Sequence, residues 1–292
     1  MVKIETADTS LAALKLLASQ RPLVIGHRGC CQFAPENTLP SFTLALEVGV
    51  DLVELDYRHS KDGVPVVIHD GELDRTTDAR ERWGRKRIPV ASKTAAEIQS
   101  LDAGSWFHPK FAGAKVPLLT EALDVIQRSA VPLIERKAGD ARACAKLLHD
   151  KNLINHVVVI SFDWHYLRVF HELYPSQVLG ALDPPGLLSN GQRPSAFSKR
   201  LNAARLVDLA KTGARVVVWN RQVSADAVRL AHRRGLNVWV YTVNAPALAN
   251  RLLDLGVDGI ITNNPSLILK TLPSGRPARG KNSSTCEQDL LT

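Results

Sequence analysis

Short apolar runs alternate with amphipathic stretches along most of the chain. Eight runs rich in Val, Ile and Leu are bounded by polar or turn-forming residues, a pattern typical of buried β-strands. We expect strands at residues 22–26, 51–57, 131–135, 157–161, 178–182, 215–219, 237–243 and 258–262. Between them apolar residues recur at helical spacing, and several of these stretches end at a glycine suited to a left-handed helix end. We expect helices at residues 39–49, 119–128, 141–151, 165–174, 201–213, 224–235 and 245–256.

Eight strands that alternate with helices predict an α/β fold with a parallel sheet. Over roughly 250 residues this alternation favours a closed (β/α)8 (TIM) barrel, and a doubly wound open sheet is the alternative. A chain of 292 residues with 45% hydrophobic composition can bury one large core. We therefore expect a single domain over residues 1–272.

Two segments depart from the repeat. Residues 59–70, HSKDGVPVVIHD, have the Asp-Gly turn signal of a β-hairpin, and a long polar stretch follows them. Because a connection of this length is unusual in a compact domain, we expect a small inserted subdomain over about residues 71–118, after the second strand. Residues 273–292 are rich in Pro, Gly, Ser and charge, which predicts a disordered tail.

Charge and cysteine content narrow the function classes. Lys and Arg exceed Asp and Glu by 37 to 29, which favours an anionic substrate, but no basic stripe with interleaved aromatic residues predicts nucleic-acid binding. The four cysteines lack zinc-ligand spacing and are expected to be reduced. No apolar stretch approaches the roughly 18 residues of a membrane span, and the N-terminal residues do not resemble a signal peptide. We expect a cytoplasmic protein without stable membrane insertion; its oligomeric state is open.

Polar residues collect where the predicted strands end, and in a TIM barrel these strand ends form the active site. Taken singly, each has a structural explanation, such as a turn histidine or a surface ion pair. Together they place two histidines, three carboxylates and two cations at one rim. The residues are His27, Arg28, Glu54, Asp56, His69, Glu135 and Lys137.

The three carboxylates, Glu54, Asp56 and Glu135, would repel one another in a cleft unless a cation lay between them. An all-oxygen ligand set favours Mg²⁺ or Ca²⁺ over zinc. Two imidazoles beside cationic side chains suit acid/base catalysis at a phosphorus centre. No P-loop or dinucleotide-binding fingerprint is present, so hydrolysis or internal displacement of a phosphodiester fits best.

An ordered series of motifs resembles the glycerophosphodiester phosphodiesterase family, which is related in fold to the phosphatidylinositol-specific phospholipases C. The matching stretches are GHRG (26–29), PENTLPSF (35–42), VELD (53–56), DGVPVVIHD (62–70), LDRTT (73–77), LDAGSWF (101–107), PLLTEAL (117–123), LIERK (133–137), VVISFD (158–163), YTVN (241–244) and GVDGIIT (256–262). The resemblance implies hydrolysis of glycerophosphodiesters to sn-glycerol 3-phosphate and an alcohol such as choline or ethanolamine.

The resemblance also implies roles for individual residues. His27 and His69 match the general acid/base pair, Glu54, Asp56 and Glu135 match the metal ligands, and Arg28 and Lys137 match the phosphate-binding cations. Supporting roles are expected for three residues: Glu36, Asn37 and Asp70. Candidate pocket walls are Trp106, Phe107, Phe162 and Tyr241, although Trp106 and Phe107 could equally form a local core of the insertion.

Two positions depart from the family pattern, which often has Trp at the position of Tyr241 and Asp at that of Asn263. We expect Asn263 to affect substrate preference rather than catalysis. Two alternative functions remain open. One is a lysophospholipase-D-type or cyclising phosphodiesterase acting on lipids, and the other is a binding module that holds a phosphate ligand without turnover.

Overall fold

Eight parallel strands close into a barrel in the computed structural model, which describes residues 12–194 and 201–272. The expected tail at 273–292 lies outside the described residues. The barrel strands are β1 (Leu23–Gly26), β2 (Leu52–His59), β4 (Val131–Arg136), β5 (Val158–Ser161), β6 (Val178–Asp183), β7 (Val216–Asn220), β8 (Asn237–Tyr241) and β9 (Gly259–Thr262). Pairing of β1 with both β2 and β9 closes the ring, which confirms the predicted TIM barrel and excludes the open sheet.

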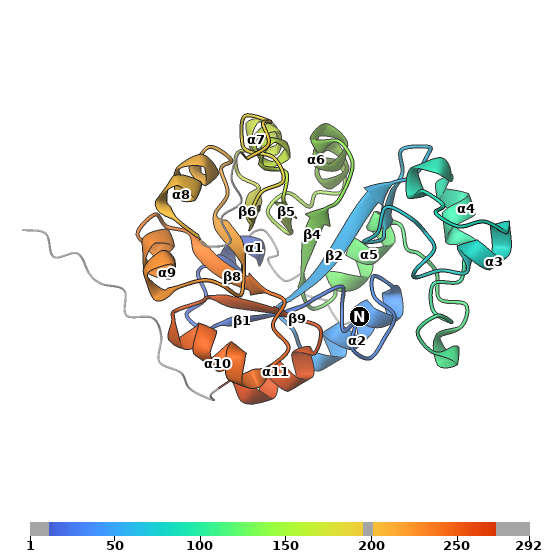
Figure 1. Cartoon of the computed structure of the whole chain (residues 1–292), viewed down its shortest axis with the longest axis horizontal. Helices are drawn as coiled ribbons and strands as arrows, with labels where there is room; N and C mark the ends of the chain where they lie inside the picture. Colours follow the sequence, from blue (N-terminus) through green and yellow to red (C-terminus); the bar gives the residue numbers. More distant parts are fainter. Residues whose placement is uncertain (1–11, 195–200, 273–292) are drawn as a thin grey trace, which may run out of the picture.

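Helices surround the barrel and connect successive strands (Figure 1). They are α2 (Leu39–Val48), α5 (Leu119–Ile126), α6 (Ala141–Asp150), α7 (Trp164–Leu173), α8 (Ala203–Ala210), α9 (Ala225–His232), α10 (Pro246–Asp254) and α11 (Pro265–Thr271). The predicted helices correspond to α2 and α5 to α10, whereas α11 was not expected. The strand predicted at residues 237–243 is shorter in the structure, where β8 ends at Tyr241.

Side-chain alternation along the strands produces two apolar layers. One set, including Val53 and Ile134, packs outward against the helices. The other set, including Leu52 and Leu133, fills the barrel interior. Another unexpected helix, α1 (Ala12–Leu17), packs its apolar side chains against the interior set. None of the helices in the two described ranges is long and apolar enough to cross a bilayer.

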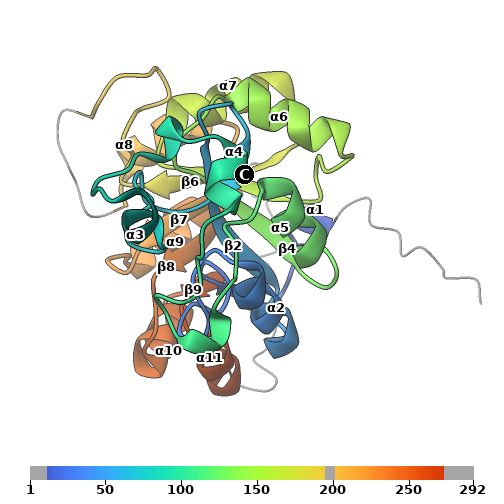
Figure 2. The ribbon, with the colours of Figure 1, turned by 90° about the vertical axis from the view of Figure 1, so that its right-hand side faces the viewer.

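The segment after β2 forms the expected hairpin and then a compact insertion, at the position of the inserted subdomain expected over about residues 71–118. Strand β3 (Pro65–Val67) pairs antiparallel with β2. The insertion contains α3 (Ala79–Trp83), η1 (Val90–Ser92), α4 (Ala95–Gln99) and η2 (Pro109–Phe111). Its own apolar cluster includes Leu73, Ile88 and Ile98. It lies beside β2 and α5 at one side of the barrel in Figure 1 and faces the viewer in Figure 2.

Candidate active site

Three carboxylates from two neighbouring strands converge inside the barrel mouth. Glu54 and Asp56 point inward from β2, because they share the side-chain parity of the interior residue Leu52. In the parallel register between β2 and β4, Asp56 lies opposite Glu135. The three side chains are buried, and one oxygen from each lies within 4.8 Å of the others.

The three carboxylates titrate differently because their neighbours differ. Burial, together with repulsion from Asp56 and Glu135, holds the pKa of Glu54 well above its usual range. Burial and the charge of Asp56 raise the pKa of Glu135 to about 7. Burial also acts to raise the pKa of Asp56, but Lys137 and Arg28 outweigh it and hold that pKa below its usual range. Without a further cation, Glu54 and Glu135 therefore resist ionisation, whereas Asp56 is held in its charged form by Lys137 and Arg28.

The cluster fits a divalent cation. Glu54 Oε1 is buried without a hydrogen-bond partner, and the buried Asp56 Oδ1 and Glu135 Oε1 both form ion pairs with the Lys137 ammonium. An unpartnered buried oxygen such as Glu54 Oε1 is costly, and three carboxylates whose oxygens lie this close together are the ligands that a hard cation prefers. These three residues could therefore hold Mg²⁺ or Ca²⁺.

Arg28 connects the carboxylate cluster to the loop that follows β1. Its backbone N–H donates to Glu54 Oε2 at 2.7 Å, and its guanidinium Nε lies 3.2 Å from Asp56 Oδ2. Its Nη1 donates to Glu36 Oε1 at 2.7 Å. Arg28 and Gly29 both have positive φ, and a Cβ on Gly29 would lie 2.4 Å from Ser41 Oγ, so the turn requires glycine there.

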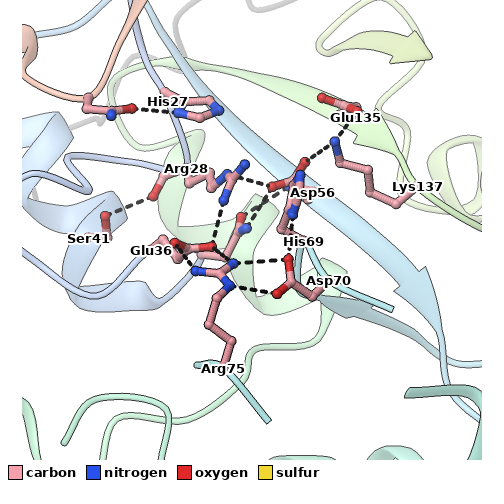
Figure 3. A network of polar contacts seen from close by, with 12 residues as sticks. His27, Arg28, Glu36, Ser41, Asp56, His69, Asp70, Arg75, Glu135 and Lys137 are labelled. Atoms are coloured by element: carbon pink, nitrogen blue, oxygen red, sulfur yellow. Dashed lines mark hydrogen bonds and ion pairs between the residues drawn. The ribbon is translucent and has the colours of Figure 1, made fainter. Parts of the chain in front are cut away.

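Lys137 supplies the second cation, from the chain just beyond β4. Its Nζ lies 3.2 Å from Asp56 Oδ1 and also forms an ion pair with Glu135. Figure 3 shows Lys137 and Arg28 approaching Asp56 from opposite sides. A phosphate bound beside Asp56 would therefore meet two cationic side chains, Arg28 after β1 and Lys137 after β4.

Asn37 holds Asp56 from the loop before α2. Its Nδ2 donates to Asp56 Oδ2 at 2.8 Å, and its Oδ1 accepts the Asp56 backbone N–H at 3.1 Å. Asn37 has a positive φ of 58°, a conformation that asparagine tolerates better than most residues. Asn37, for which the sequence predicts a supporting role, thus contacts both the side chain and the backbone of Asp56.

His27 lies at the end of β1 and is held from the opposite end of the chain. Its Nδ1 donates to Asn263 Oδ1 at 2.6 Å. Burial and the nearby charge of Arg28 lower the pKa of His27 to about 4. Asn263, which we expect from the sequence to affect substrate preference, is therefore a direct hydrogen-bond partner of His27.

His69 lies at the end of the hairpin, beside its neighbour in sequence. Its Nδ1 lies 2.7 Å from Asp70 Oδ1. Burial lowers the pKa of His69, although Asp56 and Asp70 act in the opposite direction. The pair has the geometry of an imidazole oriented by a carboxylate.

Arg75 was not predicted from the sequence as a site residue. It links Asp70, the partner of His69, to Glu36, the partner of Arg28. Its Nε and Nη2 donate to Asp70 at 2.6 and 3.1 Å. Its Nη1 and Nη2 donate to Glu36 at 2.9 and 2.7 Å. The hydrogen bonds from Arg75 hold the pKa of Asp70 well below its usual range. The signal was the LDRTT motif, which had been matched without assigning a role to its arginine.

The candidate pocket walls fall into two groups. Phe162 and Tyr241 lie in the barrel interior, with ring centroids 6.1 Å apart, and Tyr241 donates its hydroxyl to the Asp183 carbonyl at 3.0 Å. Trp106 and Phe107 lie in the insertion and contact each other edge to face, and Phe107 also contacts Phe111. The contacts of the second group are those of a local aromatic cluster.

Comparison with known proteins points to one family. The profile of the Glycerophosphoryl diester phosphodiesterase family matches residues 27–267. A glycerophosphodiester phosphodiesterase of Bacillus subtilis (strain 168) is 34% identical, with 87% of this chain and 88% of the relative covered. A phosphodiesterase of Oleispira antarctica, solved in complex with the product sn-glycerol-3-phosphate, superposes with a TM-score of 0.74 at 27% identity and covers 87% of this chain and 98% of its own. A glycerophosphodiester phosphodiesterase from Agrobacterium tumefaciens superposes with a TM-score of 0.69 at 28% identity, over 85% of this chain and 99% of its own.

Proposed function

Because the chain belongs to the glycerophosphoryl diester phosphodiesterase family and is a phosphodiester-hydrolysing enzyme, we propose that it uses one divalent cation to hydrolyse glycerophosphodiesters. The products are sn-glycerol 3-phosphate and an alcohol. The product found in the Oleispira relative supports the first of these.

The observation that carries the proposal is the convergence of Glu54, Asp56 and Glu135, whose carboxylate oxygens lie within 4.8 Å of one another in a buried cluster. Mg²⁺ or Ca²⁺ bound there would attract the substrate phosphate and stabilise charge on its non-bridging oxygens. Arg28 and Lys137 bind the same phosphate, because both ammonium and guanidinium donors lie at the cluster.

The two histidines move the protons. His27 is uncharged at neutral pH, and its Nδ1–H is committed to Asn263, so Nε2 is free to accept a proton from the attacking hydroxyl or water. His69 gives a proton to the departing alcohol oxygen, and Asp70 stabilises its imidazolium. Glu36 and Asn37 position Arg28 and Asp56.

The test is the release of glycerol 3-phosphate from a panel of glycerophosphodiesters. We expect turnover that EDTA abolishes and that Mg²⁺ or Ca²⁺ restores, and loss of turnover in His27→Ala and His69→Ala. His149→Ala changes an exposed histidine on α6 and serves as the matched control. Activity that persists in EDTA would remove the metal from the proposal, and an active His27→Ala would remove the base.

Neither alternative function gains support from the described residues. An apolar groove of about 840 Å³ is lined by α2, η2 and residues near Phe33, but none of its described lining residues belongs to the carboxylate cluster, so this groove does not itself connect an acyl chain to the proposed metal position. A binding module without turnover would not need two oriented histidines. Intact diester after hours with Mg²⁺ or Ca²⁺ would favour that alternative.

A further inference from the structure

A cavity adjoins the carboxylate cluster on the side of β4, β5 and β6. It has a volume of about 580 Å³. Its lining includes Glu135 and Lys137, which also belong to the cluster, together with Arg136, Phe162, Asp163 and Arg193. A phosphate at the cluster would therefore lie next to this cavity.

The cavity beside His69, on the side away from β4 to β6, is much smaller. This cavity, between Glu36, Asn37 and His69, measures about 10 Å³, which is room for no more than about one water molecule. A diester has two alcohol groups, and the larger cavity can accommodate one of them. Resting on the proposed function, we infer that the cavity beside β4 to β6 is the head-group subsite and that it selects an uncharged polyol, such as glycerol or inositol, over choline or ethanolamine.

The first argument is that the acidic groups of the cavity are already engaged. Asp163 Oδ2 accepts a hydrogen bond from Arg136 at 2.9 Å, and its Oδ1 accepts the Tyr166 backbone N–H at 3.0 Å. Glu135 faces Lys137 and the metal position. Neither carboxylate is available to an ammonium head group.

The second argument concerns aromatic surface. Quaternary ammonium groups are bound by several aromatic faces arranged as a cage. Phe162 is the one aromatic side chain among the described residues of the lining, and the Lys137 ammonium lies 5.9 Å from its ring centroid. A second cation would compete with Lys137 for this ring.

The third argument is the positive charge. Arg193 is exposed on the loop after β6 and has no ion-pair partner in residues 12–194 and 201–272. Together with Lys137 it repels a cationic head group, while its N–H groups can donate to the hydroxyl oxygens of a polyol. The lining thus offers donors and excess positive charge, which an uncharged polyol tolerates and choline does not.

The experiment compares kcat/KM for glycerophosphoglycerol and glycerophosphoinositol with that for glycerophosphocholine and glycerophosphoethanolamine, by coupled detection of glycerol 3-phosphate. We expect the polyol diesters to be preferred by about tenfold or more. Arg193→Glu should shift the ratio about fivefold toward the choline diester. Arg221→Glu makes the same change at an exposed position after β7, outside the cavity lining, and should leave the ratio unchanged.

The outcomes separate this inference from the proposed function. Turnover of all four diesters with choline preferred, or an unchanged ratio in Arg193→Glu, would overturn the subsite assignment alone. No glycerol 3-phosphate from any of the four would overturn the proposed function itself.

Discussion

His27 and Asn263 lie at the ends of the first and last barrel strands and are joined by a hydrogen bond of 2.6 Å between Nδ1 and Oδ1. An amide oxygen only accepts, so the proton of the neutral imidazole stays on Nδ1. The lone pair is then on Nε2. Closure of the barrel through β1 and β9 is what brings the two residues together.

Replacing Asn263 by aspartate should shift the acid limb of the pH–activity profile to higher pH. A carboxylate next to His27 favours the imidazolium and raises the His27 pKa from about 4 by roughly one unit or more. A base that remains protonated to higher pH works less well at mildly acidic pH. The measurement is kcat/KM from pH 4 to 9 for the Asn263→Asp variant and the parent.

Asn264→Asp is the control for this variant. Asn264 caps α11 by accepting the Leu267 backbone N–H, a role that aspartate also fills. Its profile should overlay that of the parent. A profile of Asn263→Asp that also overlays it would show that His27 is not the titrating base.

Arg75→Lys should reduce kcat by about 10- to 100-fold, the usual effect of losing a group that orients a catalytic residue. One ammonium cannot reproduce the hydrogen bonds that the guanidinium makes to Asp70 and Glu36. The His69 ring and the Arg28 side chain would then lose their shared support. Steady-state kinetics should show a larger change in kcat than in KM.

Chemical rescue distinguishes positioning from folding at this site. The Arg75 side chain is 46% exposed, so free guanidinium can reach its place in Arg75→Ala and should restore part of kcat. Arg87→Ala removes an exposed arginine that pairs with Glu72, and should retain full activity. Absence of rescue in a folded Arg75→Ala protein would contradict the positioning role.

Metal removal should lower the thermal stability as well as the activity. A ligand that binds only the folded state contributes about 2.7 kcal/mol at a hundredfold excess over Kd, which corresponds to roughly 5–10 °C in Tm for a domain of this size. Glu54→Gln should lose this response because it removes one charged ligand. Calorimetry with EDTA and with added Mg²⁺ or Ca²⁺ measures this change in Tm. Glu47→Gln, on α2, should respond like the parent.

The metal-free protein should lose stability as pH rises from about 4.5 to about 7 through the ionisation of Glu135. The folded-state pKa of this carboxyl lies above its ordinary value, so the folded state holds a proton that the unfolded state has released in this window. Denaturant unfolding of the parent and of Glu135→Gln in EDTA gives the difference in free energy at each pH. A difference that does not vary with pH would contradict the raised pKa.

Most of the architecture could be predicted because its signals are local. Apolar runs of strand length alternate with helical periodicity, and the Asp-Gly turn marks the hairpin. The helices α3 and α4 of the insertion were not predicted individually, and α1 and α11, which were also missed, are short and lie at the ends of the described chain. Their positions depend on packing against an already closed barrel, which no local pattern encodes.

The sequence by itself determined which groups reach the rim, since strand parity aligns Glu54 with Asp56 and the strand ends carry His27, His69 and Glu135. Tertiary structure alone decided how those groups are held. The contacts of Arg75 with Glu36 span 39 residues, and that of His27 with Asn263 spans 236. Periodicity reports which face a side chain occupies along one strand, whereas a contact between distant segments depends on barrel closure and register.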